Sequence, residues 1–341
     1  MAERLLEVND LSVSFATEDG VVRAVDGVSF DVDKGRTLAI VGESGSGKSV
    51  TSAAVMGLHN PKRTDISGSI RLDGEEIVGA SPSRLRELRG KRMAMIFQDP
   101  LSSLHPFYPI GRQLVEAAQV HQDINKSDAE KRAVELLKRV GIPNAERRAH
   151  EYPHQLSGGM RQRVMIAMSL MNDPDLLIAD EPTTALDVTV QAQIMDLLRT
   201  LQDEFGTAII LITHDLGVVA ESVSRVIVMY GGEVVEEASV VDLFARAHHP
   251  YTEGLLNAMP HVGQERERLA TIPGTVPPPT AWPVGCRFHD RCAYAWDRCA
   301  AEHPPLYQIG SGHVSRCHLA DEPQRRSQKH EPLVVVQDSG L

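Results

Sequence analysis

The sequence predicts an α/β fold with a mainly parallel sheet, an antiparallel β subdomain and a helical insertion. Residues 5–38 alternate short apolar runs with turn signals, as antiparallel strands do. Residues 83–150 have a mostly helical pattern with charged faces. Strand-like apolar runs return at 176–179, 208–213 and 225–229. This order of elements implies a parallel core that carries the helical segment as an insertion.

The most informative segment is 42–49, which reads Gly-Glu-Ser-Gly-Ser-Gly-Lys-Ser and fits a phosphate-binding loop. Glycines let main-chain N–H groups approach a phosphate, the lysine brings a positive charge, and the last serine offers a hydroxyl to magnesium. An apolar run at 36–41 precedes the loop, and a helix-compatible stretch at 50–58 would turn its N-terminus toward the anion. The rival dinucleotide-binding pattern fails, because Val50 stands where its third glycine would be. The sequence therefore predicts a triphosphate site at Gly42, Ser44, Gly45, Gly47, Lys48 and Ser49.

Two carboxylates, Asp180 and Glu181, end a later apolar run. We expect Asp180 to hold magnesium, directly or through water. Glu181 lies one residue further on, so it can point to the other side and orient or deprotonate an attacking water.

Two single polar residues, Gln98 and His214, each follow a strand-like apolar run. Ligands collect at the C-terminal ends of strands in open α/β sheets. We therefore expect Gln98 to reach the magnesium and the water, and His214 to contact the terminal phosphate and steady Glu181.

A second phosphate-seeking segment is predicted at 156–162, which reads Leu-Ser-Gly-Gly-Met-Arg-Gln. Ser157 can cap a helix that begins close behind it, and Gly158 and Gly159 leave the free N–H groups of that helix open to an anion. The segment has no lysine of its own. Beside a phosphate loop, it suggests that the triphosphate of one chain is completed by the helix of another.

Composition narrows the class of protein. The chain has 341 residues, which suits one large domain with an appendage, or two domains. Its net charge of −11 argues mildly against a dedicated nucleic-acid binder. No stretch approaches the ~18 apolar residues of a membrane span, and the first residues lack a signal-peptide core. We expect a cytosolic protein that reaches a membrane only through a partner.

Together these motifs resemble those of an ATP-binding-cassette (ABC) ATPase over residues 5–260, in the order of that family. The resemblance makes 42–49 the Walker A loop, 156–162 the signature motif and 176–180 the Walker B strand. It implies that ATP is the nucleotide and that Glu181 is the catalytic carboxylate.

The same resemblance assigns the remaining motifs. Gln98 matches the Q-loop, His214 the H-loop, and Asp187 closes the D-loop at 185–187. Phe15 lies roughly where the family has its adenine-stacking aromatic, and a phenylalanine in a core strand fits that position equally well.

Two further stretches, 151–163 and 248–256, are similar to the dipeptide/oligopeptide importer ATPases, although nickel importers share much of the pattern. The resemblance implies a complex of two membrane permease subunits, an extracytoplasmic solute-binding protein and two ATPase subunits. The second ATPase is a paralogue or another copy of this chain. The chain would then lie peripherally on the cytoplasmic face of the membrane, couple hydrolysis of ATP with Mg²⁺ to peptide translocation, and bind no nucleic acid.

The implied fold class is a P-loop NTPase of ABC type. Its nucleotide-binding domain would span 1–255, with the helical insertion at about 84–160. A small cysteine-containing extension of peptide-transporter type would follow at 256–325, and a flexible tail at 326–341.

All four cysteines of the chain, Cys286, Cys292, Cys299 and Cys317, lie in that extension. Four thiolates suit an iron–sulfur cluster or an all-cysteine zinc site, but the spacing lacks the paired Cys-x-x-Cys knuckles typical of zinc. Resemblance to the peptide importers implies a [4Fe–4S] cluster, which would be structural or redox-sensing. Zinc and no metal stay open as alternatives, and nearby histidines are alternative ligands: His289, His303, His313 and His318.

Two other function classes compete with import. A soluble ABC ATPase that acts on chromosomes would carry a long coiled coil between the phosphate loop and the signature, whereas residues 50–156 show no sustained heptads. Ribosome-acting members usually carry two cassettes, and this chain has one. An exporter ATPase is compatible with a single cassette, but the peptide-importer tail argues against it.

Overall fold

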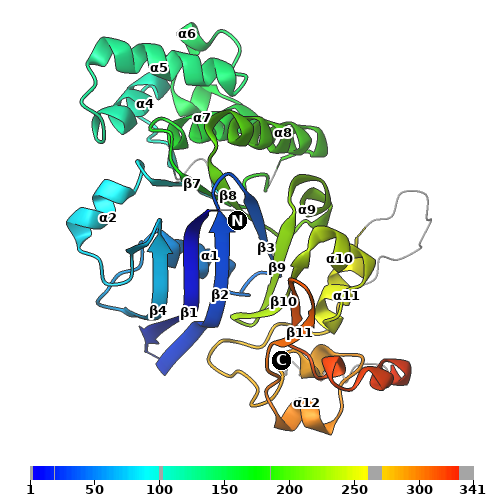
Figure 1. The fold of residues 1–341 in the computed structure, drawn as a ribbon. Coiled ribbons are helices and arrows are strands. Elements are labelled where there is room, and N and C mark those ends of the chain that lie inside the picture. Colours follow the sequence, from blue (N-terminus) through cyan, green and yellow to red (C-terminus); the bar gives the residue numbers. More distant parts are fainter. Residues whose placement is uncertain (1–2, 19, 100–102, 185, 260–270, 330–341) are drawn as a thin grey trace, which may run out of the picture.

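The computed structural model describes residues 3–18, 20–99, 103–184, 186–259 and 271–329. Two β-sheets lie at the centre of the described part, and a group of helices projects from one end (Figure 1). The mixed α/β architecture with an antiparallel sheet confirms the predicted fold class.

The smaller sheet is antiparallel and has the strand order β2-β1-β4-β5. It contains β1 Arg4–Thr17 and β2 Gly20–Asp33, which the alternating N-terminal pattern predicted, together with β4 Thr64–Leu72 and β5 Glu75–Glu76.

The larger sheet has the strand order β11-β12-β10-β9-β3-β8-β7-β6. The five strands from β9 to β6 are parallel, and the other three continue the sheet antiparallel. The central strands β3, β7 and β8 are almost entirely buried and apolar, as expected for parallel strands covered on both faces. The bounds are β3 Thr37–Val41, β6 Met93–Ile96, β7 Leu176–Asp180, β8 Ala208–Thr213, β9 Arg225–Tyr230, β10 Glu233–Ser239, β11 Tyr307–Gly310 and β12 His313–Ser315.

The projecting helices are α4, α5 and α6, which lie above α7 and α8 at one end of the larger sheet (Figure 1). The predicted insertion at 84–160 also contains β6, but that strand pairs with β7 in the core sheet, so the projecting part begins at α4. The helices are α1 Lys48–Val55, α2 Pro82–Leu88, α4 Ile110–Gln119, α5 Lys126–Arg139, α6 Ala145–Arg148, α7 Gly158–Ser169, α8 Val188–Phe205, α9 Leu216–Ser222, α10 Val240–Ala245, α11 Pro250–Asn257 and α12 Asp297–Ala301.

The C-terminal extension is joined to the rest of the described chain through the larger sheet. Strand β12 pairs with β10, and β11 pairs with β12. Short 3₁₀ helices complete this region, at η2 His289–Arg291, η3 His318–Ala320 and η4 Pro323–Gln328, whereas η1 Pro153–Gln155 precedes the signature segment. Of the predicted tail, 330–341 lies outside the described residues, as does 260–270 of the extension.

Three apolar clusters form the core. One lies between the projecting helices and the sheet, the second between the two sheets around α1, and the third beneath the C-terminal extension. No helix in the described part of the chain is long and apolar enough to cross a membrane.

Candidate functional site

The phosphate loop connects β3 to α1, and the glycines at its two ends fit where other residues would collide. Gly42 has φ 156°, and a Cβ there would clash with the carbonyl oxygen of Met229. Gly47 has φ 100°, and its Cβ would lie 2.8 Å from the carbonyl oxygen of Ala24. Between them, Ser44 and Gly45 are exposed. The loop is therefore tightly packed at its ends and open to solvent at its tip.

Lys48 begins α1, and its side chain is folded back into the loop. Its Nζ donates to the carbonyl oxygens of Gly42 at 2.7 Å and Glu43 at 2.9 Å. Burial lowers the pKa of the ammonium group, while the carboxylates of Glu181 and Asp180 act in the opposite direction. The lysine thus holds a positive charge inside the curve of the loop.

Ser49 and Asp180 meet although they lie 131 positions apart, with Ser49 Oγ donating to Asp180 Oδ1 at 3.3 Å. Burial raises the pKa of the Asp180 carboxyl, and the Glu181 charge adds to this effect. These two oxygen donors suit a hard cation such as Mg²⁺.

Glu181 is surrounded by three polar side chains. Its Oε2 accepts from Gln98 Nε2 and from Thr184 Oγ1, both at 2.8 Å. Its Oε1 lies 3.4 Å from His214 Nδ1. The structure therefore brings together Gln98, Glu181 and His214, which the sequence placed on three separate strand ends.

The signature segment lies at the N-terminus of α7. Ser157 is its N-cap and accepts from the backbone N–H of Met160 at 3.3 Å, as predicted. Ser157 and Gly158 are exposed, and a Cβ at Gly158 would meet nothing within 4 Å. Among the described residues, no hydrogen bond or ion pair joins this segment to the phosphate loop of the same chain.

Asp187 and Phe15 have local structural partners. Asp187 caps α8 by accepting from the backbone N–H of Val190 at 2.9 Å, and Ala185 of the predicted D-loop lies outside the described residues. Phe15 is half-buried on β1, and its ring packs edge-to-face with that of His59, with the ring centroids 5.4 Å apart. Both readings of Phe15, as a core residue and as an adenine contact, therefore stay open.

Comparison with known proteins identifies the family. A family model described as "ABC transporter" matches residues 25–184, and one described as "Oligopeptide/dipeptide transporter, C-terminal region" matches residues 235–299. The dipeptide transport ATP-binding protein DppD of Escherichia coli (strain K12) is 51% identical, over 92% of this chain and 96% of that protein. The chain belongs to the ABC transporter family.

Other relatives agree. The oligopeptide transport ATP-binding protein AppD of Bacillus subtilis (strain 168) is 51% identical over 93% of this chain and 97% of that protein. Among solved structures, the dimeric ATP-binding cassette MJ0796 bound to ADP and Pi has a TM-score of 0.63 at 28% identity, covering 69% of this chain and 98% of that one. CbiO1 from Clostridium perfringens has a TM-score of 0.61 at 31% identity, covering 72% and 92%.

The four cysteines of this ABC protein line one small cavity in the C-terminal extension, together with His289 and His318. All are free thiols. Burial raises the pKa of each thiol, that of Cys317 to about 12. The donor set suits an all-thiolate group, but within the described residues no three or more His, Cys, Asp or Glu side chains form a site for a single metal ion.

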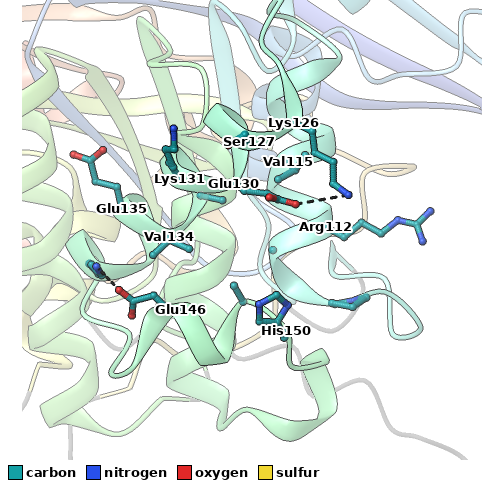
Figure 2. A pocket seen from close by; sticks show the side chains of 15 residues that line it. Arg112, Val115, Lys126, Ser127, Glu130, Lys131, Val134, Glu135, Glu146 and His150 are labelled. Atoms are coloured by element: carbon teal, nitrogen blue, oxygen red, sulfur yellow. Dashed lines mark ion pairs between the residues drawn. The ribbon is translucent and has the colours of Figure 1, made fainter.

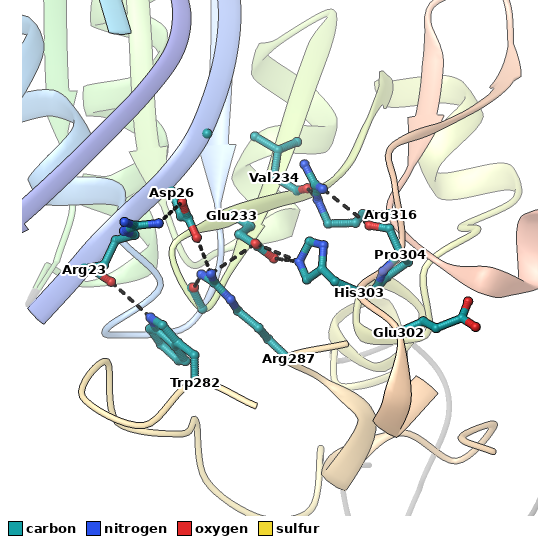
Figure 3. A network of polar contacts seen from close by, with 12 residues as sticks. Arg23, Asp26, Glu233, Val234, Trp282, Arg287, Glu302, His303, Pro304 and Arg316 are labelled. Carbon is teal, nitrogen blue, oxygen red and sulfur yellow. Dashed lines mark hydrogen bonds and ion pairs between the residues drawn. The ribbon is translucent and has the colours of Figure 1, made fainter. Parts of the chain in front are cut away.

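Two arginines next to these cysteines were not predicted as part of the ABC site. Figure 3 shows Arg287 between Asp26 of β2 and Glu233 of β10, with Trp282 and His303 on either side. Arg291 lies four residues further on and pairs with Glu43 of the phosphate loop. No sequence motif signals these contacts, because Arg287 and Asp26, like Arg291 and Glu43, lie more than 200 positions apart in the chain.

A further hollow of ≈ 760 Å³ lies on the projecting helices of the ABC domain (Figure 2). Its floor includes the apolar side chains of Val115 and Val134, and charged residues surround them. Lys126 pairs with Glu130 at 3.7 Å on this rim. The sequence predicted the insertion but not this hollow.

Proposed function

We propose that this chain is the ATP-hydrolysing subunit that energises import of dipeptides and oligopeptides through a membrane permease complex. The proposal rests mainly on one observation, the meeting of the phosphate loop with Asp180 and Glu181 at one edge of the sheet. Similarity to proteins named for dipeptide and oligopeptide transport supports the cargo. These names do not favour nickel or another small solute as cargo, or a soluble ATPase that acts on nucleic acid or the ribosome.

ATP binding follows from the loop. The N–H groups at the start of α1 and the Lys48 ammonium face the β- and γ-phosphates, where positive charge is needed. Ser49 and Asp180 would hold Mg²⁺, with Gln98 nearby, and the ion would neutralise part of the phosphate charge. The adenine ring of ATP would stack on Phe15.

Hydrolysis is assigned to Glu181 and its neighbours. The carboxylate accepts a hydrogen bond from water and orients it toward the terminal phosphate. His214 steadies Glu181 and contacts the phosphate, and Gln98 leaves Glu181 to face the cation and the water.

A second ATPase subunit would complete each site. The exposed N-terminus of α7, with Ser157, Gly158 and Gly159, would close over the γ-phosphate of the partner, and Asp187 would lie at the same interface. The two subunits would sit on the cytoplasmic face of the membrane against two permease subunits, with an extracytoplasmic binding protein delivering the peptide. The hollow on the projecting helices is our candidate contact for a permease subunit. When the two ATPase subunits close on ATP, a permease bound there would be pulled with the helices.

We also propose a [4Fe–4S] cluster at Cys286, Cys292, Cys299 and Cys317. The support is that all four thiols line one cavity, with Cys286 half-buried and the other three buried. Such a cluster takes its ligands from four thiolates. When bound, it would tie together the ends of a segment that otherwise holds few helices and strands.

Uptake of defined peptides tests the main proposal. A strain that lacks the chain should lose uptake, and Lys48→Ala should not restore it, because the loop then lacks its buried cation. Turnover of ATP should fall by about 100-fold or more. Lys62→Ala, which changes an exposed lysine outside the loop, is the matched control and should restore uptake. Normal uptake with Lys48→Ala would remove the central assignment.

Iron and acid-labile sulfide analysis tests the cluster. Anaerobically purified wild-type chain should contain both, and Cys292→Ser should lose them, because a buried thiolate ligand is missing. Zinc in place of iron would favour the zinc alternative, and absence of every metal would leave four reduced thiols.

A further inference from the structure

The phosphate loop is tied to the C-terminal extension by a two-point ion pair. Arg291 Nη1 donates to Glu43 Oε2 at 2.8 Å, and Arg291 Nη2 donates to Glu43 Oε1 at 3.1 Å. The Arg291 side chain is only 5% exposed, and its Nε donates to the carbonyl oxygen of Pro273 at 2.8 Å. The arginine is therefore fixed on both sides, and a bidentate contact of this kind is strong and directional.

The backbone N–H, the carbonyl oxygen and the carboxylate of Glu43 all form hydrogen bonds. Its backbone N–H donates to Tyr251 Oη at 2.7 Å, and its carbonyl oxygen accepts from Lys48 Nζ at 2.9 Å. The carboxylate that Arg291 grips thus belongs to a residue that also positions the lysine. A shift of Glu43 would move the cation that faces the triphosphate.

We propose that Arg291 is a positioning residue of the ATP site and acts through Glu43 to hold the phosphate loop in its binding shape. The inference rests on the proposed function, which assigns this loop to ATP. If Arg291 acts in this way, the cysteine-containing extension supports the nucleotide site, although Arg291 follows Glu43 by more than 200 residues.

Arg291 could instead serve only to hold the extension against the rest of the protein. The chain offers a matched control that separates this structural role from positioning of the phosphate loop. Arg287 lies four residues earlier on the same segment and is also buried between carboxylates. Its partners, the carboxylates of Asp26 and Glu233 and the carbonyl oxygen of Gly231, lie outside the phosphate loop. Arg291 and Arg287 therefore share burial and docking, but only Arg291 contacts the loop.

The experiment measures the Kd for ATP with Mg²⁺, and the Tm, on the full-length chain. We expect Arg291→Gln to raise the Kd about tenfold, because a buried two-point contact is lost. Arg291→Lys should recover part of the affinity, since it keeps the charge but not the fork. Arg287→Gln should lower the Tm at least as much and leave the Kd within about twofold. In a Glu43→Ala background, Arg291→Gln should have no further effect on the Kd.

Three outcomes would overturn the inference: an unchanged Kd in Arg291→Gln, an equal rise in Arg287→Gln, or an undiminished effect of Arg291→Gln when Glu43 is alanine. If Arg291→Gln does not fold, Arg291→Lys decides, and a wild-type Kd in that variant contradicts the inference. Failure of the proposed function gives a different result, because then the wild-type chain itself would not bind ATP, or Lys48→Ala would bind it normally.

Discussion

Asp180 and Glu181 are adjacent in the chain but have different surroundings. Asp180 ends β7, is 6% exposed and accepts from Ser49. Glu181 has φ 47°, a backbone conformation that non-glycine residues rarely adopt. Strain of this kind persists where the surrounding structure imposes it, often at functional sites. Here it places the second carboxylate among Gln98, Thr184 and His214 instead of beside the first.

Glu181→Gln should therefore separate ATP binding from hydrolysis. The amide keeps the size of the side chain but cannot take a proton from water, so hydrolysis should fall by about 100-fold or more. ATP binding should persist, and closed dimers should accumulate. The measurement is phosphate release beside equilibrium ATP binding and size-exclusion chromatography with ATP.

Thr184→Val is the control for that prediction, because it removes one hydrogen bond to Glu181 and leaves the carboxylate. Its hydrolysis should drop far less than that of Glu181→Gln, since the carboxylate that orients the water remains and only one of its hydrogen bonds is lost. Unchanged hydrolysis in Glu181→Gln would mean that another group orients the water.

Among the elements, helix α7 presents a capped but uncovered N-terminus. Ser157 satisfies the N–H of Met160, whereas Gly158 is open to solvent and touches nothing in its own phosphate loop. A helix start of this kind favours an anion. Because this helix start touches nothing in the chain's own phosphate loop, we propose that it faces the nucleotide of a second subunit.

Ser157→Asp tests that placement. Aspartate caps a helix as well as serine does, so α7 should stay folded, but its charge would repel a triphosphate. The isolated chain should bind ATP with unchanged affinity, whereas ATP turnover by the assembled complex should be lost.

Ser157→Asn is the neutral control, because asparagine also caps the helix, and it should retain much of the turnover. Weaker ATP binding by the isolated Ser157→Asp chain would place the signature over the loop of its own subunit, against our proposal.

On the scale of the whole molecule, the C-terminal extension is fastened to the core by buried charges. Glu236 of β10 is fully buried, pairs with His313 of β12 at 2.8 Å, and accepts the backbone N–H groups of His248 and His249. Burial alone would raise the pKa of this carboxyl, but these hydrogen bonds outweigh it and lower the pKa. For the adjacent Glu237, burial prevails over Arg225 and raises the pKa.

These opposite directions predict unequal effects of two neighbouring substitutions. Glu236→Gln should reduce the free energy of unfolding by about 2 to 3 kcal/mol at pH 7, because an amide cannot accept all three donors. The contribution of a carboxyl with a lowered pKa is present above its unfolded value and disappears as the pH falls through its folded value. The gap between wild type and Glu236→Gln should therefore close below a pH of about 4.5.

Glu237→Gln should change stability at pH 7 much less, since the fold already disfavours that charge. Urea unfolding at several pH values measures both variants. An equal loss in the two, or a gap for Glu236→Gln that does not close in acid, would contradict this account of how the extension is attached.

The sequence by itself determined the site elements whose chemistry lies in consecutive residues. The loop at Gly42–Ser49, the carboxylates after β7 and the capped start of α7 each follow from local backbone rules, because phosphate binding and helix capping depend on neighbouring N–H groups. Apolar runs and their alternation likewise predicted β1, β2 and the parallel strands of the larger sheet, since burial on one or two faces imposes its own period. They did not predict β10, β11 and β12.

Only the tertiary structure decided which distant residues meet. Arg291 belongs to no motif, Glu43 is an unspecified position of the phosphate-loop pattern, and their contact depends on β12 pairing with β10 and drawing the extension against the loop. The same packing gathers the four cysteines around one cavity. Pairing of the parallel strands brings Gln98 to Glu181, along with His214, whose contact with Glu181 the sequence predicted. Such contacts arise from the summed burial of the whole fold, which no single stretch of sequence contains.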